Sequence, residues 1–173
     1  MPTLTPVLSA HWDEPDAHTY AGYTRHGGYQ GARRALTQMQ PDEVIAAVKD
    51  SGLRGRGGAG FPTGVKWGFI PQGDNKPHYF VVNADESEPG TFGNRYAIEA
   101  DPHGLIEGML ICCYAVGIQK AYIYIRGENL AGAEKLEHAI KQNRHTCASD
   151  LKIISVAYQT LTFTKWSYSQ GNS

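Results

Sequence analysis

The sequence predicts an α/β fold in which a parallel sheet is flanked by helices. Two stretches of almost continuous apolar residues, 78–83 and 120–126, have the composition of strands that are covered on both faces. Helical patterns follow each of them, at residues 102–117 and 130–142, and a third candidate strand lies at 150–158. An alternation of strand and helix is typical of βαβ units, whose strands pair in parallel.

The part of the chain before the first strand predicts an irregular segment and two helices. Residues 1–20 show no period and contain three prolines, so we expect an irregular lead-in. Residues 28–40 carry apolar side chains at helical spacing and predict a short helix. Residues 41–51 predict a second helix, because a proline and two acids occupy its first turn and Gly52 follows its end.

The two helices predicted after the strands each carry an inward apolar row. These rows are Leu105, Met109, Cys112 and Val116 in the first helix, and Ala133, Leu136 and Ile140 in the second. Cys112 and Cys113 are therefore interpreted as small apolar core residues. Cys147 is the third cysteine, and no C-x-x-C occurs, so the chain supports no disulfide framework, zinc site or four-cysteine iron–sulfur site.

Composition and charge narrow the class of protein. The 173 residues amount to about one domain, and 41% hydrophobic with 19% charged residues indicates a globular chain. A net charge of −1 argues against a dedicated nucleic-acid binder. No apolar run reaches the roughly 18 residues of a membrane span. The first residues also lack the features of a targeting signal, so we expect a cytoplasmic location.

The stretch 52–67 is the most informative part of the sequence. Six of its sixteen residues are glycine, and Arg54, Arg56 and Lys66 are basic. Glycine buries no side chain but lets a backbone approach a ligand closely, so converging N–H groups and nearby cations could bind an anion. The alternative is a flexible surface loop, but flexible linkers combine glycine with serine rather than with Arg, Phe and Trp.

This glycine loop matches neither of the two standard nucleotide-binding loops. Gly55, Gly57 and Gly60 fit G-x-G-x-x-G, but that fingerprint needs a strand before it and a helix after it. A predicted helix precedes the loop and Pro62 follows at once. No Gly-Lys-Ser/Thr is present, so the Walker pattern fails too.

Polar segments follow both predicted strands. Asn83, Asp85, Glu86 and Glu88 come after the first strand, and residues 126–128 end the second. Ligands of open α/β sheets bind beyond the carboxyl ends of the strands, so we expect both segments at one ligand-binding edge, within reach of the glycine loop. Acids beside a basic loop suit a ligand with one anionic end and one hydroxyl-rich or cationic part.

Flavin mononucleotide has these properties, and a dinucleotide could lie over it with Phe61 or Phe69 stacked on its adenine. The alternatives for the acids are a solvated turn or ion pairs with Arg54 and Arg56. A metal site is disfavoured, because the histidines are scattered and are expected at the surface or at helix caps. They are His11, His18, His26, His78, His103, His138 and His145. No catalytic triad or reactive cysteine stands out, so redox chemistry would belong to the cofactor.

Three motifs together indicate a family. The stretches 51–67, 83–92 and 124–128 closely resemble the NADH-oxidising flavoprotein subunit of respiratory complex I, which is the F subunit of NADH–quinone oxidoreductase. Related subunits occur in NAD-linked hydrogenases and formate dehydrogenases. The resemblance runs from about Tyr20 to about Asn143.

The resemblance implies a Rossmann-like FMN-binding domain that passes a hydride from NADH to FMN and then single electrons to iron–sulfur clusters. The residues that match the FMN site are Gly55, Arg56, Gly57, Gly58, Ala59, Gly60, Lys66, Asn83, Asp85 and Glu86. Those that match the NADH site are Phe61, Phe69 and Glu88. It implies no catalytic side chain and no metal ligand in this chain.

The resemblance also implies partners and a location. The family assembles with other peripheral-arm subunits of complex I, especially the 2Fe–2S subunit, in the respiratory chain that reduces quinone. It binds no nucleic acid and does not insert into the membrane. The implied place is the bacterial cytoplasm, peripheral to the inner membrane through the complex.

The sequence departs from the family toward its end. The family continues with a second motif rich in Gly and Glu, a ubiquitin-like segment and a helical bundle whose cysteines bind a 4Fe–4S cluster. None of these follows here, which predicts a lead-in at 1–20, a partial FMN/NADH-binding domain at 21–145 that is incomplete at its C-terminus, and an unmatched tail at 146–173. A truncated or frame-shifted product would look like this. The alternatives are a non-catalytic interaction module and an unrelated phosphate-binding α/β protein.

Overall fold

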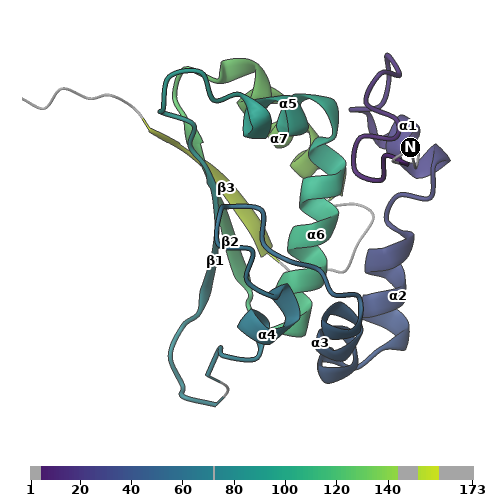
Figure 1. Cartoon of the computed structure of the whole chain (residues 1–173), viewed down its shortest axis with the longest axis vertical. Coiled ribbons are helices and arrows are strands. Elements are labelled where there is room, and N and C mark those ends of the chain that lie inside the picture. Colours follow the sequence, from purple (N-terminus) through teal and green to yellow (C-terminus); the bar gives the residue numbers. More distant parts are fainter. Residues whose placement is uncertain (1–4, 72, 144–151, 160–173) are drawn as a thin grey trace, which may run out of the picture.

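The computed structural model describes residues 5–71, 73–143 and 152–159, the last of these through its backbone alone. The helices are α1 (Tyr20–Arg25), α2 (Gln30–Gln38), α3 (Pro41–Asp50), α4 (Thr63–Trp67), α5 (Gly93–Ala100), α6 (Pro102–Ala115) and α7 (Leu130–Asn143). The strands are β1 (Tyr79–Ala84), β2 (Lys120–Arg126) and β3 (Lys152–Gln159) (Figure 1). Within these ranges no helix combines the length and apolar character that crossing a membrane requires.

The three strands form one parallel sheet in the order β1-β2-β3. Tyr79 pairs with Lys120 at one end of the first ladder, and Ala84 pairs with Ile125 at the other. The predicted α/β fold with a parallel sheet is therefore confirmed, together with all three predicted strands. The two helices predicted before β1 correspond to α2 and α3, and those predicted after β1 and β2 correspond to α6 and α7.

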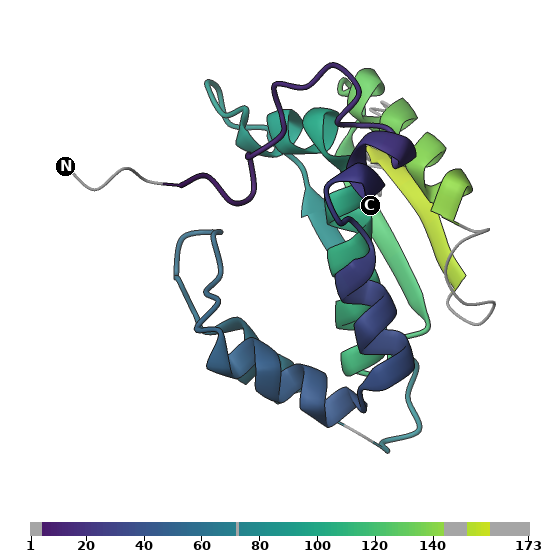
Figure 2. The same cartoon turned by 90° about the vertical axis from the view of Figure 1, so that its right-hand side faces the viewer.

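Helix α6 is the centre of the packing. It contacts α2, α3, α7 and β2, so it links the N-terminal helices to the sheet (Figures 1 and 2). Its buried Ile106 and Met109 belong to one core cluster with Ile123 and Ile125 of β2 and Leu136 of α7. The parallel ladder pairs Ala84 with Ile125 at the carboxyl ends of β1 and β2, and both residues also belong to this core.

The sheet has helices on only one side in the described part of the chain (Figure 1). Along β2, Ala121, Ile123 and Ile125 are buried, and the residues between them are not. Along β1, Tyr79 and Val81 are 51% and 61% exposed. The prediction that both strands are covered on both faces is wrong for these residues, and an apolar sheet face is left open.

Both cysteines in the described residues lie in the core, as predicted. Cys112 and Cys113 are buried on α6. Burial raises the pKa of the Cys112 thiol to about 12 and that of Cys113 to about 11. Both are therefore protonated at neutral pH, and neither has the thiolate character of a reactive cysteine.

The structure contains three short helices that the sequence patterns did not predict, α1, α4 and α5. The first turn of α5 is capped by a residue outside the helix. Asn94 N and Arg95 N donate hydrogen bonds to the Glu86 carboxylate at 2.8 and 2.9 Å. Helix α4 begins directly after Pro62 and packs on α3. Helices this short are stabilised by contacts with the rest of the protein, and they are too short for a repeating apolar pattern to indicate them.

A buried polar cluster joins α6 to the start of α2. The Glu107 carboxylate accepts hydrogen bonds from Tyr29 N and Ala32 N, both at 2.8 Å, and from the Tyr23 hydroxyl. The Tyr29 hydroxyl lies 2.7 Å from His103 Nδ1. His103 is fully buried, so the expectation of a surface or capping position is wrong for this histidine.

Replacing Gly64 with alanine should destabilise the junction between α3 and α4. A Cβ at Gly64 would lie 2.6 Å from Lys49 N, which is a backbone atom that cannot turn away. We expect a loss of about 1–3 kcal/mol in the free energy of unfolding, measured by urea denaturation. Gly108→Ala is the matched control, because its Cβ would meet nothing within 4 Å on a helix. It should be neutral or stabilising, and equal losses in the two variants would contradict the packing argument.

Candidate functional site

The glycine loop is a hairpin that leaves the end of α3 and returns to α4. Gly55 N donates to the Phe61 carbonyl and Thr63 N donates to the Leu53 carbonyl, both at 2.9 Å. Arg54 and Pro62 form an antiparallel bridge at its base. The base of the hairpin is thus closed by backbone hydrogen bonds, and the exposed tip lies between them.

Arg54 has a different role from the one that the composition suggested. Its Nε donates to the Gly60 carbonyl at 2.7 Å, so the side chain binds the loop's own backbone. From the sequence, Arg54 was expected to supply positive charge for an anionic ligand. In the structure its side chain instead stabilises the hairpin.

The glycines of the tip combine unusual backbone angles with open space. Gly58 and Gly60 have φ values of 114° and 59°, in the left-handed region that favours glycine. A Cβ at Gly57 or Gly58 would meet nothing within 4 Å. The tip is therefore not packed against another part of the described chain, and its backbone stays accessible to a ligand.

A cavity of about 770 Å³ lies beside this loop, between α4 and the start of β1. A volume of this size is in the range of small-molecule sites. The residues of the predicted site that line it are Gly55, Gly57, Ala59, Gly60, Phe61, Lys66 and Phe69. The rings of Phe61 and Phe69 lie 6.0 Å apart, and both are well exposed. The cavity thus combines an ammonium group, open backbone and aromatic surface.

The polar residues after β1 do not line this cavity. Asn83 lies in a separate cavity of about 220 Å³, and Asp85, Glu86 and Glu88 line neither of the two. Glu86 caps α5, as described above. Asp85 accepts from the Ser87 hydroxyl at 2.8 and 2.9 Å. Among the described residues no ion pair joins these acids to Arg54 or Arg56, so this alternative for the acids finds no support there.

The two segments that follow the strands lie together at one edge of the sheet, as expected. Arg126, at the end of β2, donates from Nη1 to the Glu86 carbonyl at 2.8 Å. Its Nη2 lies 2.6 Å from Glu128 Oε2. The cavity at the glycine loop instead borders the start of β1, where Tyr79 and Phe80 line it. A shared site for all three segments therefore stays a prediction.

The N-terminal segment supplies residues to the Asn83 cavity that the sequence patterns did not indicate. Leu8 and Trp12 line this cavity, and the Trp12 ring packs edge-on against Tyr96 of α5 at 5.3 Å. The segment was expected to be irregular, and no period pointed to these two residues. The available signal was a lone tryptophan in a polar stretch.

The glycine loop lies in a part of the chain that matches a known protein family. A family model described as the Nuo51 FMN-binding domain matches residues 48–171. This range contains the glycine loop, β1, β2 and the polar segments that follow both strands.

Several relatives carry the same name. The F subunit of NADH-quinone oxidoreductase in Streptomyces coelicolor is 59% identical over 139 residues, which is 80% of this chain and 31% of that protein. The protein of that name from Mycobacterium tuberculosis is 56% identical over 146 residues, again 80% of this chain and 33% of the relative. The Escherichia coli protein is 48% identical over 121 residues, covering 69% and 27%. The chain thus spans about a third of the length of these relatives.

Solved structures of an NAD⁺-reducing [NiFe]-hydrogenase have the same arrangement of elements. In the H₂-reduced state the similar chain gives a TM-score of 0.65 at 33% identity, covering 88% of this chain and 25% of that one. In the air-oxidised state the TM-score is 0.64, with 88% and 24% covered. The similarity therefore extends through almost all of the present chain.

Proposed function

Because this chain belongs to the Nuo51 FMN-binding domain family, we propose that it binds FMN beside the glycine loop and serves the oxidation of NADH. The observation that carries the proposal is the open hairpin tip, which borders a cavity with a lysine and two aromatic rings. FMN held there would supply the hydride and single-electron chemistry, and the protein would supply binding and orientation.

The residues present fit the chemistry of FMN. Lys66 offers an ammonium group for a phosphate, and Phe61 and Phe69 offer apolar ring surface for a planar group. The missing side chains at Gly57 and Gly58 leave room for close approach. Arg54 contributes indirectly, because it stabilises the hairpin that carries these groups.

The acidic segment has two proposed roles. Asn83 and Asp85 are proposed to hold the flavin together with the loop residues from Gly55 to Gly60, and Glu88 is proposed to help place NADH with Phe61 and Phe69. Glu86 holds the start of α5 and binds Arg126 through its carbonyl. We infer that it acts on FMN binding mainly by positioning the segment around it.

The activity of the whole protein is a further part of the proposal. Relatives about three times as long are named as the F subunit of NADH-quinone oxidoreductase. We propose that this chain is the FMN- and NADH-binding part of such an enzyme subunit in complex I, with quinone as the final acceptor. It would assemble with other peripheral-arm subunits, including the 2Fe–2S subunit, on the cytoplasmic side of the bacterial membrane. No ligand of the family's 4Fe–4S cluster is proposed in this chain.

Replacing Lys66 with glutamine should weaken FMN binding and leave riboflavin binding unchanged. Titrating the chain into FMN and following flavin fluorescence quenching measures the affinity. A charged hydrogen bond to phosphate contributes about 1.5–3 kcal/mol, so we expect a loss of roughly 10- to 100-fold. Riboflavin lacks the phosphate and serves as the matched ligand.

Lys76→Gln is the control variant, because Lys76 is exposed and lies outside the cavity. It should bind FMN as the original chain does. If Lys66→Gln lost the same affinity for FMN as for riboflavin, Lys66 would not contact the phosphate. No quenching of FMN by the original chain at micromolar concentration would remove the proposal that this chain alone binds the flavin.

A second candidate function is supported by the open face of the sheet. Tyr79 and Val81 of β1 and Tyr124 of β2 expose apolar surface there, which suits an interaction module without catalytic activity. A cooperative thermal transition that neither FMN nor NADH shifts would favour this function. Family membership excludes the other alternative, an unrelated phosphate-binding α/β protein.

A further inference from the structure

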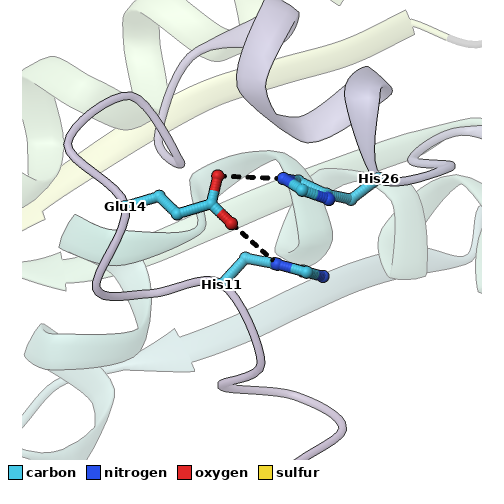
Figure 3. A group of neighbouring side chains, drawn as sticks. All are labelled: His11, Glu14 and His26. Atoms are coloured by element: carbon cyan, nitrogen blue, oxygen red, sulfur yellow. Dashed lines mark hydrogen bonds and ion pairs between the residues drawn. The ribbon is translucent and has the colours of Figure 1, made fainter.

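The N-terminal segment folds back on α1 and brings three potential metal ligands together. His11 Nδ1 lies 2.9 Å from Glu14 Oε1, and His26 Nε2 lies 2.9 Å from Glu14 Oε2 (Figure 3). The three ligand atoms all lie within 4.8 Å of one another. No other group of three His, Cys, Asp or Glu residues comes this close in the part of the chain that the structure describes.

The backbone around these residues is held by contacts that do not involve the cluster itself. Thr19 caps α1 by accepting a hydrogen bond from Gly22 N at 3.0 Å. Gly22 lies so close to the preceding segment that a Cβ there would be 2.1 Å from the Asp16 carbonyl oxygen. Arg25 of α1 forms an ion pair with Asp16. The segment with His11 and Glu14 is therefore docked next to His26, which caps the end of α1.

The ligand types favour a transition metal over Mg²⁺ or Ca²⁺. Two imidazole nitrogens and one carboxylate oxygen form a set that suits Zn²⁺, whereas the harder cations prefer oxygen ligands alone. Arg25 Nη1 lies 3.7 Å from Glu14 Oε2 and opposes a cation there. Asp16 pairs with Arg25 and offsets its charge, so the cluster keeps the negative charge of Glu14.

We propose that His11, Glu14 and His26 bind one divalent transition-metal ion of the Zn²⁺ class, which clamps the N-terminal segment to α1. The ion would replace the protons that now bridge the imidazoles to the carboxylate. Three protein ligands leave one position of a tetrahedral zinc ion for water. The clamp would fix the segment that carries Leu8 and Trp12 to the Asn83 cavity.

Binding requires small side-chain movements that the surroundings allow. Ligands of a tetrahedral zinc ion lie about 3.4 Å apart, given metal–ligand distances of about 2.1 Å, so the present 2.9 Å contacts must widen slightly. The two imidazole rings are stacked at 3.6 Å and must turn so that their lone pairs converge. The side chains are 48%, 36% and 28% exposed for His11, Glu14 and His26, which leaves room for this rotation.

Calorimetric titration of the metal-free 173-residue chain with Zn²⁺ tests the proposal. We expect one ion per chain, at least a 10-fold weaker affinity in Glu14→Gln, and at least a 100-fold weaker affinity in the His11→Ala/His26→Ala double variant. Zn²⁺ should raise the Tm of the original chain but not that of Glu14→Gln. Co²⁺ gives a second readout, because its visible absorption reports tetrahedral coordination. Circular dichroism without metal checks that each variant keeps its fold.

His78→Ala is the matched control. His78 Nε2 lies 2.9 Å from Asp74 Oδ1, which makes an exposed His–carboxylate pair without a third ligand. This variant should bind Zn²⁺ as the original chain does. The proposal is overturned if the original chain binds Zn²⁺ no more tightly than the double variant, or if His78→Ala weakens binding as much as Glu14→Gln does.

Discussion

Replacing Glu107 with alanine is expected to lower the free energy of unfolding by about 3–5 kcal/mol, which is a large part of the stability of a domain of this size. The carboxylate lies between α6 and α2 and is almost fully buried. It accepts hydrogen bonds from Tyr29 N and Ala32 N, so alanine would leave two buried amides without their acceptor. The Tyr23 hydroxyl would lose its acceptor as well.

The conformation of Tyr29 adds to this effect. Its φ of 64° is in the left-handed region, which is uncommon for a residue with a large side chain. The hydrogen bond from its amide to Glu107 helps to hold that conformation at the start of α2. Burial raises the pKa of Tyr23 and the hydrogen bond to Glu107 raises it further, so the phenol remains a donor at neutral pH.

Urea denaturation of three variants measures the contribution of Glu107. Glu107→Gln keeps one acceptor oxygen and should lose less stability than Glu107→Ala. Glu134→Ala is the control, because Glu134 is an exposed residue of α7 and its loss should change stability by less than about 0.5 kcal/mol. Similar losses in Glu107→Ala and Glu134→Ala would show that the buried hydrogen bonds contribute little.

Acidification should destabilise the fold through His103, with a loss of about 2 kcal/mol by pH 5 and about 3 kcal/mol by pH 4. Burial lowers the pKa of His103 from its ordinary value of 6.5 to about 4. The folded chain therefore binds fewer protons than the unfolded chain between these two values. Stability is complete above pH 6.5 and is lost as the pH falls toward 4.

The difference between the original chain and His103→Gln isolates this effect from other titrating groups. Unfolding free energies are measured in urea at pH 7, 5 and 4. His103→Gln should be less stable at pH 7, because the contact of His103 Nδ1 with the Tyr29 hydroxyl is altered, but should lose less stability on acidification. Parallel pH profiles for the two chains would contradict a buried neutral imidazole.

The regular part of the fold could be predicted because its residues repeat with a clear period. The apolar rows of α6 and α7 and the dense runs of β1 and β2 indicated both the element types and the parallel sheet. Short helices gave no such signal. Helix α5 depends on Glu86, a residue outside the helix, and α4 depends on the close fit of Gly64 against Lys49.

For the site, the sequence predicted which segments take part but not how their side chains are arranged. Residue types pointed to the glycine loop, and the structure places Lys66, Phe61 and Phe69 at one cavity with it. Spacing carries no information on side-chain direction, which is why Arg54 was interpreted as a ligand contact although it binds Gly60. The approach of His11 to His26 results from a chain reversal, which the scattered positions of the histidines in the sequence do not indicate.

The ladder between β1 and β2 bears on how the chain reaches its native state. Pairing Tyr79 with Lys120 encloses the whole of α5 and α6 between the two partners. Contacts so distant in sequence form slowly, because a long loop must close before they contribute. During synthesis on a ribosome, β1 would emerge well before β2. The first strand would then acquire its neighbour only after the whole helical crossover has been made.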